Sequence, residues 1–273
     1  MARSITVSKS DDMTGYSEIL QEAHGAAAWI VLNRPRELNA LTSVMLDELA
    51  RGLAAAESDA AVRALVITGS GEKAFCAGAD LRQVLAECPV GEPDFLDRAA
   101  ATLGRLRDFP KPVIAAVNGL ALAGGLELVL CCDLVIAADS ARFGDAHANF
   151  GVFPGGGGAA ILPRRVGPAR AKYLLYSGEQ VSAHRMLDWG VVNEVVPPAE
   201  LRAATDALVA KIAAKSPLVL QRMKRVADRA LDQPRDDALA HELLTLRTHL
   251  RSHDLQEGLA AFGEKRAPRF EGR

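Results

Sequence analysis

The length and charge of the chain exclude several classes of protein. With 273 residues it can bury a sizeable core, either as one large domain or as a domain with a helical appendage, and it is too long for a small disulfide-stapled module. A formal net charge of −2 gives no basic footprint for nucleic acid or an anionic membrane. We therefore expect a small-molecule substrate and neither nucleic-acid nor membrane partners.

The cysteines and the N-terminal segment bear on location and on metal binding. The four cysteines form no CxxC pair and have no metal-like spacing with histidine: Cys76, Cys88, Cys131 and Cys132. We expect reduced, mostly buried thiols and no metal site. Residues 1–15 are polar and lack the apolar core of a secretory signal, and no later run reaches membrane-spanning length without a charge. The sequence thus favours a cytoplasmic protein.

Over most of the chain, short β-branched runs alternate with helical patterns, which is typical of an α/β architecture. Ala28–Asn33 is the first clear predicted strand. Leu41–Ala56 has an apolar stripe of helical period, with Thr42 and Ser43 available as caps. Ala64–Thr68 is predicted as a buried strand.

Loops and breakers continue the alternation. After Gly69, a loop leads to Asp80, a candidate N-cap for a helix that begins at Leu81. Breakers between Cys88 and Pro93 separate that helix from a second one over about Asp94–Arg107. Further segments follow in order: a strand at Pro112–Val117, a turn at Gly119–Gly125, a helix that carries Glu127, a strand at Leu134–Ala138, a loop around Phe143–His147 and the glycine run Gly155–Gly158.

The character of the chain changes near Pro197, where the strand signals stop. Ala199–Phe262 is almost entirely helical by pattern. We therefore predict a core over residues 1–196 and a helical C-terminal region over residues 197–273.

Glu127 is the only charged residue in the apolar, glycine-rich stretch 115–130. Burying an ionised carboxylate costs on the order of several kcal/mol of free energy unless it is paired or hydrogen-bonded. Two explanations remain open: a catalytic acid or base, or a structural carboxylate that local donors satisfy.

Two loops place small residues where a strand ends and a helix begins. They are Ala77–Asp80 and Ala123–Glu127. The first N–H groups of a helix are unpaired and carry partial positive charge, so two such loops together can hold an oxygen that becomes negative. Glycines at these turns are also explained by tight packing alone.

These motifs resemble the signature loops of the enoyl-CoA hydratase/isomerase, or crotonase, superfamily, and the resemblance runs from about Ile19 to Phe270. It rests on Lys73–Leu81, Val117–Leu128, Asn33–Pro35 with Leu38–Leu41, Pro154–Gly158, Gly190–Asn193 and Ala261–Arg266. The resemblance implies an α/β fold, the crotonase (ClpP-like) spiral of repeated ββα units with a C-terminal helical trimerisation region. The family performs hydration, isomerisation, hydrolysis and decarboxylation on one scaffold, so the reaction must be inferred from the site.

Carried onto this chain, the resemblance implies that the amides of Ala79 and Gly124 hold the thioester carbonyl of an acyl-CoA. Glu127 matches the first of the two acid/base glutamates of hydratases and is expected to activate water. The second glutamate is replaced by His147, which at neutral pH can either deliver a proton to the α-carbon or help Glu127 direct water to another carbon.

Two positions near His147 refine this expectation. Asp145 could orient His147, although a hydrogen-bonding spacer in the turn is the favoured interpretation. Gly155 stands where some isomerases of the family have an aspartate, which disfavours dienoyl isomerisation.

The resemblance also implies a site for coenzyme A. Arg36 and Leu38, near the first helix start, and Asp80, Leu81 and Arg82, after the first loop, would line its path. Phe262 and Lys265 match a pair that reaches the nucleotide from a neighbouring subunit, where a lysine suits a phosphate. The alternative for the last pair is a solvated surface run at Glu264–Arg266.

The function expected from the resemblance is hydration of a 2-enoyl-CoA through an enolate that an oxyanion hole stabilises. The alternatives are a CoA-thioester or C–C bond hydrolase, or an enoyl-CoA isomerase, that uses Glu127 and His147, and a non-catalytic CoA- or RNA-binding member. We expect no tightly bound cofactor, with coenzyme A entering as part of the substrate, and a homotrimer or a hexamer of paired trimers.

Overall fold

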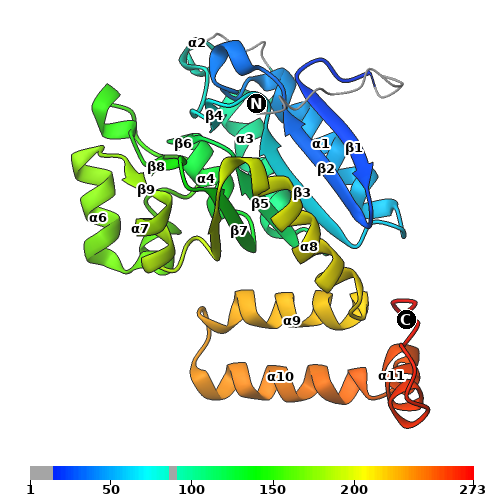
Figure 1. The fold of residues 1–273 in the computed structure, drawn as a ribbon. Helices are drawn as coiled ribbons and strands as arrows, with labels where there is room; N and C mark the ends of the chain where they lie inside the picture. The colour runs from blue at the N-terminus through cyan, green and yellow to red at the C-terminus, as the bar shows by residue number, and fades with distance from the viewer. Residues whose placement is uncertain (1–14, 86–90) are drawn as a thin grey trace.

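A computed structural model of the chain describes residues 15–85 and 91–273 (Figure 1), so Cys88 lies outside the described residues. Two sheets form its centre. The larger has six strands in the order β1 (Ile19–His24), β2 (Ala27–Leu32), β3 (Ala64–Gly69), β5 (Val113–Val117), β7 (Leu134–Ala138) and β10 (Glu194–Val196). The smaller has four in the order β4 (Ala74–Cys76), β6 (Leu120–Leu122), β8 (Arg142–Gly144) and β9 (Val181–Ser182).

The order of the strands reveals a repeated unit. Each of β3, β5 and β7 is followed by a short strand of the smaller sheet, and a helix comes next. The strands β2, β3, β5, β7 and β10 pair in parallel, as do β4, β6 and β8, whereas β1 pairs with β2 and β9 with β8 in antiparallel fashion. This arrangement is the spiral of ββα units that the resemblance implies.

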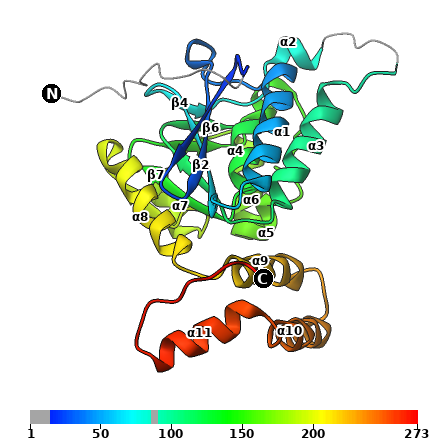
Figure 2. The ribbon, with the colours of Figure 1, turned by 90° about the vertical axis from the view of Figure 1, so that its right-hand side faces the viewer.

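Helices cover both faces of the larger sheet (Figure 2). On one face lie α1 (Ser43–Ser58) and α3 (Phe95–Arg107), and on the other lies α8 (Leu201–Ala213). The strands between them are apolar on both sides: in β2, Ile30 packs into the cluster under α1, and Trp29 packs into the cluster under α8. Strands buried on both faces have nearly continuous hydrophobic sequence, which explains the β-branched runs.

The first helices begin at residues that cap them. Thr42 accepts a hydrogen bond from the amide of Met45 (3.0 Å), and Asp80 accepts one from the amide of Arg82 (3.2 Å) at the start of the short α2 (Leu81–Val84). The N-cap predicted at Asp80 is confirmed. Helix α1 starts at Ser43 rather than Leu41, because Leu41 forms a β-bridge with Ala79.

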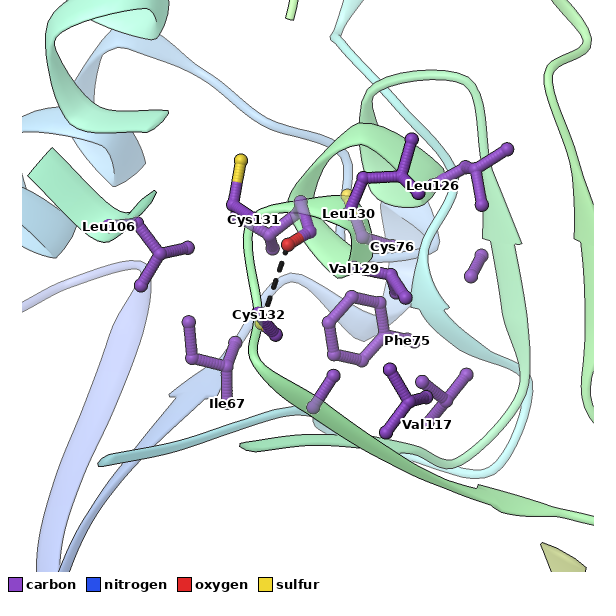
Figure 3. Close-up of a cluster of buried hydrophobic side chains, with 14 of the residues drawn as sticks. Ile67, Phe75, Cys76, Leu106, Val117, Leu126, Val129, Leu130, Cys131 and Cys132 are labelled. Carbon is purple, nitrogen blue, oxygen red and sulfur yellow. Dashed lines mark hydrogen bonds between the residues drawn. The ribbon is translucent and has the colours of Figure 1, made fainter. Parts of the chain in front are cut away.

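Helix α4 (Gly124–Leu130) is buried along its whole length. Figure 3 shows Leu126, Val129 and Leu130 of this helix in an apolar cluster with Phe75 and Ile67. At the end of the helix, the thiol of Cys132 donates to the carbonyl oxygen of Leu128 (3.4 Å). The backbone of Glu127 therefore lies inside the core.

Short helices complete the core. The α-helices are α5 (Leu162–Val166), α6 (Pro168–Ser177) and α7 (Ala183–Asp188), and the 3-10 helices are η1 (Pro35–Glu37), η2 (His147–Phe150) and η3 (Pro198–Glu200).

The C-terminal helices project from the core (Figures 1 and 2). They are α9 (Pro217–Ala230), α10 (Arg235–His249) and α11 (His253–Gly263). No residue of α9 or α10, both described in full, is buried. Because α8 packs on the larger sheet, the projecting part begins after α8, and the division at residues 196/197 stays a prediction.

The sequence-based assignment missed β1 and five strands of two or three residues. Residues 74–76 and 142–144 of predicted loops form β4 and β8, residues 120–122 of the predicted turn form β6, and β1, β9 and β10 were not predicted. Strands of three residues are too short to show a period of two, and β1 has an exposed second half. Within residues 15–85 and 91–273, no helix combines the length and hydrophobicity needed to cross a membrane.

Gly125 tests how closely α4 must approach the neighbouring strand. A methyl group at Gly125 would lie 1.9 Å from the carbonyl oxygen of Cys76, a backbone atom that cannot rotate away. We expect Gly125→Ala to lower the free energy of unfolding in urea by about 3 kcal/mol or more, at the upper end for overpacked sites. Gly104→Ala, in α3, is the matched control, because its methyl group would meet its nearest neighbour only at 3.9 Å. Equal stability of the two variants would contradict this packing.

Candidate active site

The carboxylate of Glu127 is held by the glycine run. Its side chain is buried, and its Oε1 accepts hydrogen bonds from the amides of Gly156 (2.7 Å) and Gly158 (2.9 Å). These donors lie 29 and 31 residues away along the chain. One oxygen of the buried carboxylate is therefore satisfied, and its other oxygen, Oε2, remains for a further partner.

Both donor positions leave no room for a side chain unless the neighbouring side chains move. A methyl group at Gly156 would lie 2.7 Å from Oε2 of Glu127, and one at Gly158 would lie 2.6 Å from Oδ2 of Asp145. Real Cβ atoms essentially never approach so closely. The run Gly155–Gly158 was noticed in the sequence, but its role as a cradle for Glu127 was not predicted.

His147 lies beside the free oxygen of Glu127. Its Nε2 is 4.0 Å from Oε2 of Glu127, and its Nδ1 is 3.0 Å from Oδ1 of Asp145. The structure thus brings together the two side chains predicted as the acid/base pair. It also corrects the interpretation of Asp145 as a turn spacer, because the carboxylate binds the ring of His147 and no backbone amide among the described residues.

The charges around His147 alter its affinity for a proton. Burial on its own lowers the pKa of His147, but the hydrogen bond and charge of Asp145, together with the charge of Glu127, outweigh burial. The pKa of His147 consequently lies above its ordinary value of 6.5. The two neighbouring carboxylates thus make the imidazole bind a proton more readily than an ordinary histidine does.

The amides of Ala79 and Gly124 lie close together. A methyl group at Gly124 would lie 3.4 Å from the amide nitrogen of Ala79, and one at Gly78 would lie 3.4 Å from the amide nitrogen of Gly124. Neither N–H donates to another described residue. The two predicted oxyanion donors are therefore neighbours with their hydrogen-bonding capacity unused, one helical turn from Glu127.

Two unusual backbone conformations set these amides. Gly78 has φ 111°, and Ala123 has φ 49° and ψ −119°, which is rare for a residue with a side chain. Glycine adopts a positive φ readily, whereas at Ala123 the strain costs about 1–3 kcal/mol and persists because the surroundings enforce it. Here both residues directly precede a predicted oxyanion donor.

The segment before α1 fixes the first of these loops. The carbonyl oxygen of Leu38 accepts from the amide of Ala77 (3.0 Å), and the amide of Leu41 donates to the carbonyl oxygen of Gly78 (2.8 Å). The buried side chain of Asn39 donates to the carbonyl oxygens of Ser70 and Ala74. Asn39 was not predicted as a site residue, although its run Leu38–Leu41 was one of the motifs of the resemblance.

Of the predicted CoA-binding residues, Asp80 has an anchoring position. Its carboxylate accepts from Nη2 (3.0 Å) and Nε (3.1 Å) of Arg82 and from Arg34 (3.4 Å), and it caps α2. The hydrogen bond from Arg82, with help from Arg34, lowers the pKa of Asp80 to about 2. Leu81, Arg82 and Arg36 are exposed at this edge of the first loop.

Phe262 and Lys265 lie elsewhere in the chain. Both are exposed, at and just beyond the end of α11, in the projecting part that Figure 1 shows at the opposite end of the molecule from α2. Within one chain, Phe262 and Lys265 therefore lie far from the oxyanion loops.

A pocket of about 420 Å³ adjoins the imidazole. His147 and Asp145 form part of its wall, and α6 contributes Lys172, Leu175 and Tyr176. Most of the remaining lining is apolar: Ala148, Val152, Phe153, Pro154, Ala159, Pro163 and Pro168.

The described cysteines offer no reactive group. Cys76, Cys131 and Cys132 are free and buried, and burial raises the pKa of Cys76 to about 12 and that of Cys131 to about 11. Their thiols stay protonated at neutral pH. Within the part of the chain that the structure describes, no group of three or more His, Cys, Asp or Glu residues could hold a metal ion.

Known proteins are similar to this chain in sequence and fold. A family model described as enoyl-CoA hydratase/isomerase matches residues 22–273. A crotonyl-CoA hydratase of Syntrophomonas wolfei is 37% identical over 255 residues, which cover 93% of this chain and 98% of the relative. A short-chain-enoyl-CoA hydratase of Clostridium acetobutylicum is 36% identical, covering 92% and 96%.

The crystal structure of an enoyl-CoA hydratase from Bacillus anthracis superposes with a TM-score of 0.89 at 36% identity, covering 94% of this chain and all of that one. The fold and the motifs agree with these matches across nearly the whole length. The chain belongs to the enoyl-CoA hydratase/isomerase family.

Proposed function

We propose that the protein is an enoyl-CoA hydratase that adds water across the C2–C3 double bond of a 2-enoyl-CoA. The observation that carries this proposal is the pairing of a fixed carboxylate with an imidazole. Glu127 is held by two amides at Oε1, and its Oε2 lies 4.0 Å from Nε2 of His147. That separation is too long for a direct hydrogen bond and suits two groups that share one water molecule.

The oxyanion donors would make the enoyl thioester reactive toward water. A thioester oxygen that accepts from the amides of Ala79 and Gly124 gains negative charge when a nucleophile adds at C3. Each such donor stabilises the transition state by about 2.7–4 kcal/mol. Gly124, which would bind the enolate oxygen, lies one helical turn from Glu127. The activated water and the thioester therefore meet in one site.

The proposed chemistry divides between the two side chains. Oε2 of Glu127 takes a proton from water as the water oxygen bonds to C3, and the π electrons move toward the thioester oxygen as the enolate. The imidazolium of His147 then gives its Nε2 proton to C2, and the enolate collapses to the thioester. Transfer of the proton on Glu127 back to His147 restores the starting state.

The substrate-binding surface is proposed on the same grounds. The exposed residues Arg36, Leu81 and Arg82 flank the first oxyanion loop and would contact coenzyme A, which enters as part of the substrate. Asp80 would contribute by anchoring Arg82, and Leu38 by holding the backbone of Ala77. Relatives named for crotonyl-CoA and short-chain enoyl-CoA hydration support a short acyl chain as the first substrate to test.

The distance of α11 from the site supports an assembly. Phe262 and Lys265 would reach coenzyme A only from a neighbouring subunit, in a trimer or a pair of trimers. Large apolar side chains are exposed on the projecting helices, including Met223, Leu239, Leu243, Leu244 and Phe262. We further propose a cytoplasmic enzyme of fatty-acid metabolism with no tightly bound cofactor.

A hydrolase is the second candidate function. It is supported by His147, which stands where hydratases have their second glutamate. Glu127 and His147 could direct the same water at a thioester carbonyl or at the carbon of a C–C bond. Isomerisation of a dienoyl-CoA is less favoured, because Gly155 supplies no carboxylate. An RNA-binding role has no support from the net charge of −2.

Glu127→Gln tests the water-activating role without changing the shape of the residue. The amide oxygen of Gln can still accept from Gly156 and Gly158, whereas the base is lost. We expect the rate of crotonyl-CoA hydration, followed by the fall in enoyl-thioester absorbance, to decrease about 10²–10⁴-fold. Affinity for butyryl-CoA, which cannot react, should be retained.

Measuring free-thiol release alongside the enoyl-thioester absorbance separates hydrolysis from hydration. Wild-type protein that releases free thiol from acyl-CoA esters, and hydrates no enoyl-CoA of any chain length, would contradict the proposal and favour the hydrolase.

Gly158→Ala tests the glycine cradle. Its methyl group would displace the carboxylate of Asp145 and the backbone that holds Glu127, and misplacement by about 1 Å can cost roughly 10²-fold in rate. We expect kcat for crotonyl-CoA to fall by about that factor. Gly155→Ala is the matched control, since no atom lies within 4 Å of its methyl group. Equal kcat in the two variants would show that the cradle does not matter.

A further inference from the structure

Asp145 is a buried carboxylate whose side chain has one partner among the described residues, the imidazole of His147. Its side chain is almost completely enclosed, and its Oδ1 meets Nδ1 of His147 at 3.0 Å. Oδ2 is buried and has no hydrogen-bond partner in the described part of the chain. A buried carboxylate that is only half satisfied is costly, so this position requires an explanation.

A turn-forming role does not explain the contacts of Asp145. An aspartate that stabilises a turn accepts from the backbone amide two residues on, which here is that of His147. That amide instead donates to the backbone carbonyl of Asp145 (2.7 Å), and the side chain bonds only the imidazole. The turn is made by the main chain, which leaves the carboxylate free for the ring.

The local backbone directs both side chains into the site. Strand β8 ends at Gly144, and Ala146 takes a left-handed conformation with φ 55° and ψ −11°. Asp145 and His147, on either side of Ala146, both line the pocket beside the site. Gly158 closes the other side, where any larger residue would meet Oδ2 of Asp145.

Other charged and titratable groups around His147 come from three helices. Glu127 faces the ring from α4, and Lys172 and Tyr176 line the shared pocket from α6. Arg107 of α3 donates to the carbonyl oxygen of Gly156 (3.4 Å) and so lies behind the glycine cradle. Among these, only the carboxylates of Asp145 and Glu127 lie within 4.0 Å of the imidazole nitrogens.

The ring therefore has two ends with different partners. When Nδ1–H donates to Asp145, Nε2 is the nitrogen that faces Glu127 and the space for substrate. The neutral ring in this tautomer leaves Nε2 as an acceptor, and the charged ring places a proton there.

We propose that Asp145 is a positioning residue for the reaction: by accepting from Nδ1 it fixes the orientation and tautomer of His147, so that Nε2 holds the proton given to C2. This inference rests on the proposed hydratase function for its kinetic part. Its structural part, the state of the imidazole, concerns the protein without substrate.

The first experiment observes His147 directly. Histidine labelled with ¹³C and ¹⁵N in the full chain gives a resonance that is absent in His147→Gln and therefore belongs to His147. We expect the neutral ring to carry its proton on Nδ1, and its pKa to lie above the ordinary value for histidine. In Asp145→Asn, titration should move to lower pH, because the carboxylate that favours the imidazolium is gone. A ring protonated on Nε2 when neutral, or an unchanged titration in the variant, would overturn the proposal.

The second experiment asks whether Asp145 acts through His147. We expect Asp145→Asn to lower kcat for crotonyl-CoA roughly 10-fold or more, with KM changed less than about 2-fold. Since His147 must be protonated to act, activity falls as pH rises through its pKa, and in Asp145→Asn that fall should begin at lower pH. Asp139→Asn, at an exposed aspartate outside the site, is the matched control and should leave kcat and the pH profile unchanged.

A double variant separates positioning from a general structural role. If Asp145 works only through the imidazole, Asp145→Asn combined with His147→Gln should have the kcat of His147→Gln alone. Multiplied losses in the double variant would overturn the proposal. Failure of the wild type to hydrate any enoyl-CoA would refute the proposed function, while the resonance of His147 would still decide the role of Asp145.

Discussion

The site depends on one constraint, a carboxylate placed inside an apolar helix. Glu127 lies on α4, which is buried throughout, so the chain must supply polar partners within the core. The amides of Gly156 and Gly158 satisfy one oxygen, which leaves the other oriented toward His147. The glycine run meets this need, and the turn at Ala146 leads to His147 beside the other oxygen. Without the two amides, Glu127 would be a buried charge with no hydrogen bond among the described residues.

Backbone and side chains have separate tasks in this arrangement. The amides of Ala79 and Gly124 are rigid donors, because Gly78 and Ala123 hold unusual conformations and the segment 38–41 binds the first loop. The titratable groups come from α4, the helix that Gly124 begins, and from the turn after β8. A preorganised donor pair needs no reorganisation during the reaction, which is why such sites are effective at stabilising an enolate. The backbone of the fold therefore positions the thioester that is attacked, and the side chains of Glu127 and His147 determine which reaction follows.

Much of this could be predicted from sequence, and the failures have physical causes. The long buried strands, the cap at Asp80 and the isolated charge of Glu127 are local signals, and the resemblance supplied Ala79, Gly124 and His147. The three-residue strands β6 and β8 depend on pairing partners and have no period of their own. The partners of Glu127 lie 29 and 31 residues away, and the preference of Asp145 for a ring over a backbone amide depends on the turn geometry. Contacts between distant segments are not encoded in any one motif.

Membership of the enoyl-CoA hydratase/isomerase family fixes the scaffold, and the histidine at position 147 is the feature of this chain that most affects the choice of reaction. A crystal structure with an unreactive acyl-CoA bound tests the account most directly. It should show the thioester oxygen within hydrogen-bonding distance of the amides of Ala79 and Gly124, with Nε2 of His147 facing the α-carbon and Nδ1 still bound to Asp145. A thioester oxygen away from both amides, or an imidazole turned toward solvent, would contradict the account.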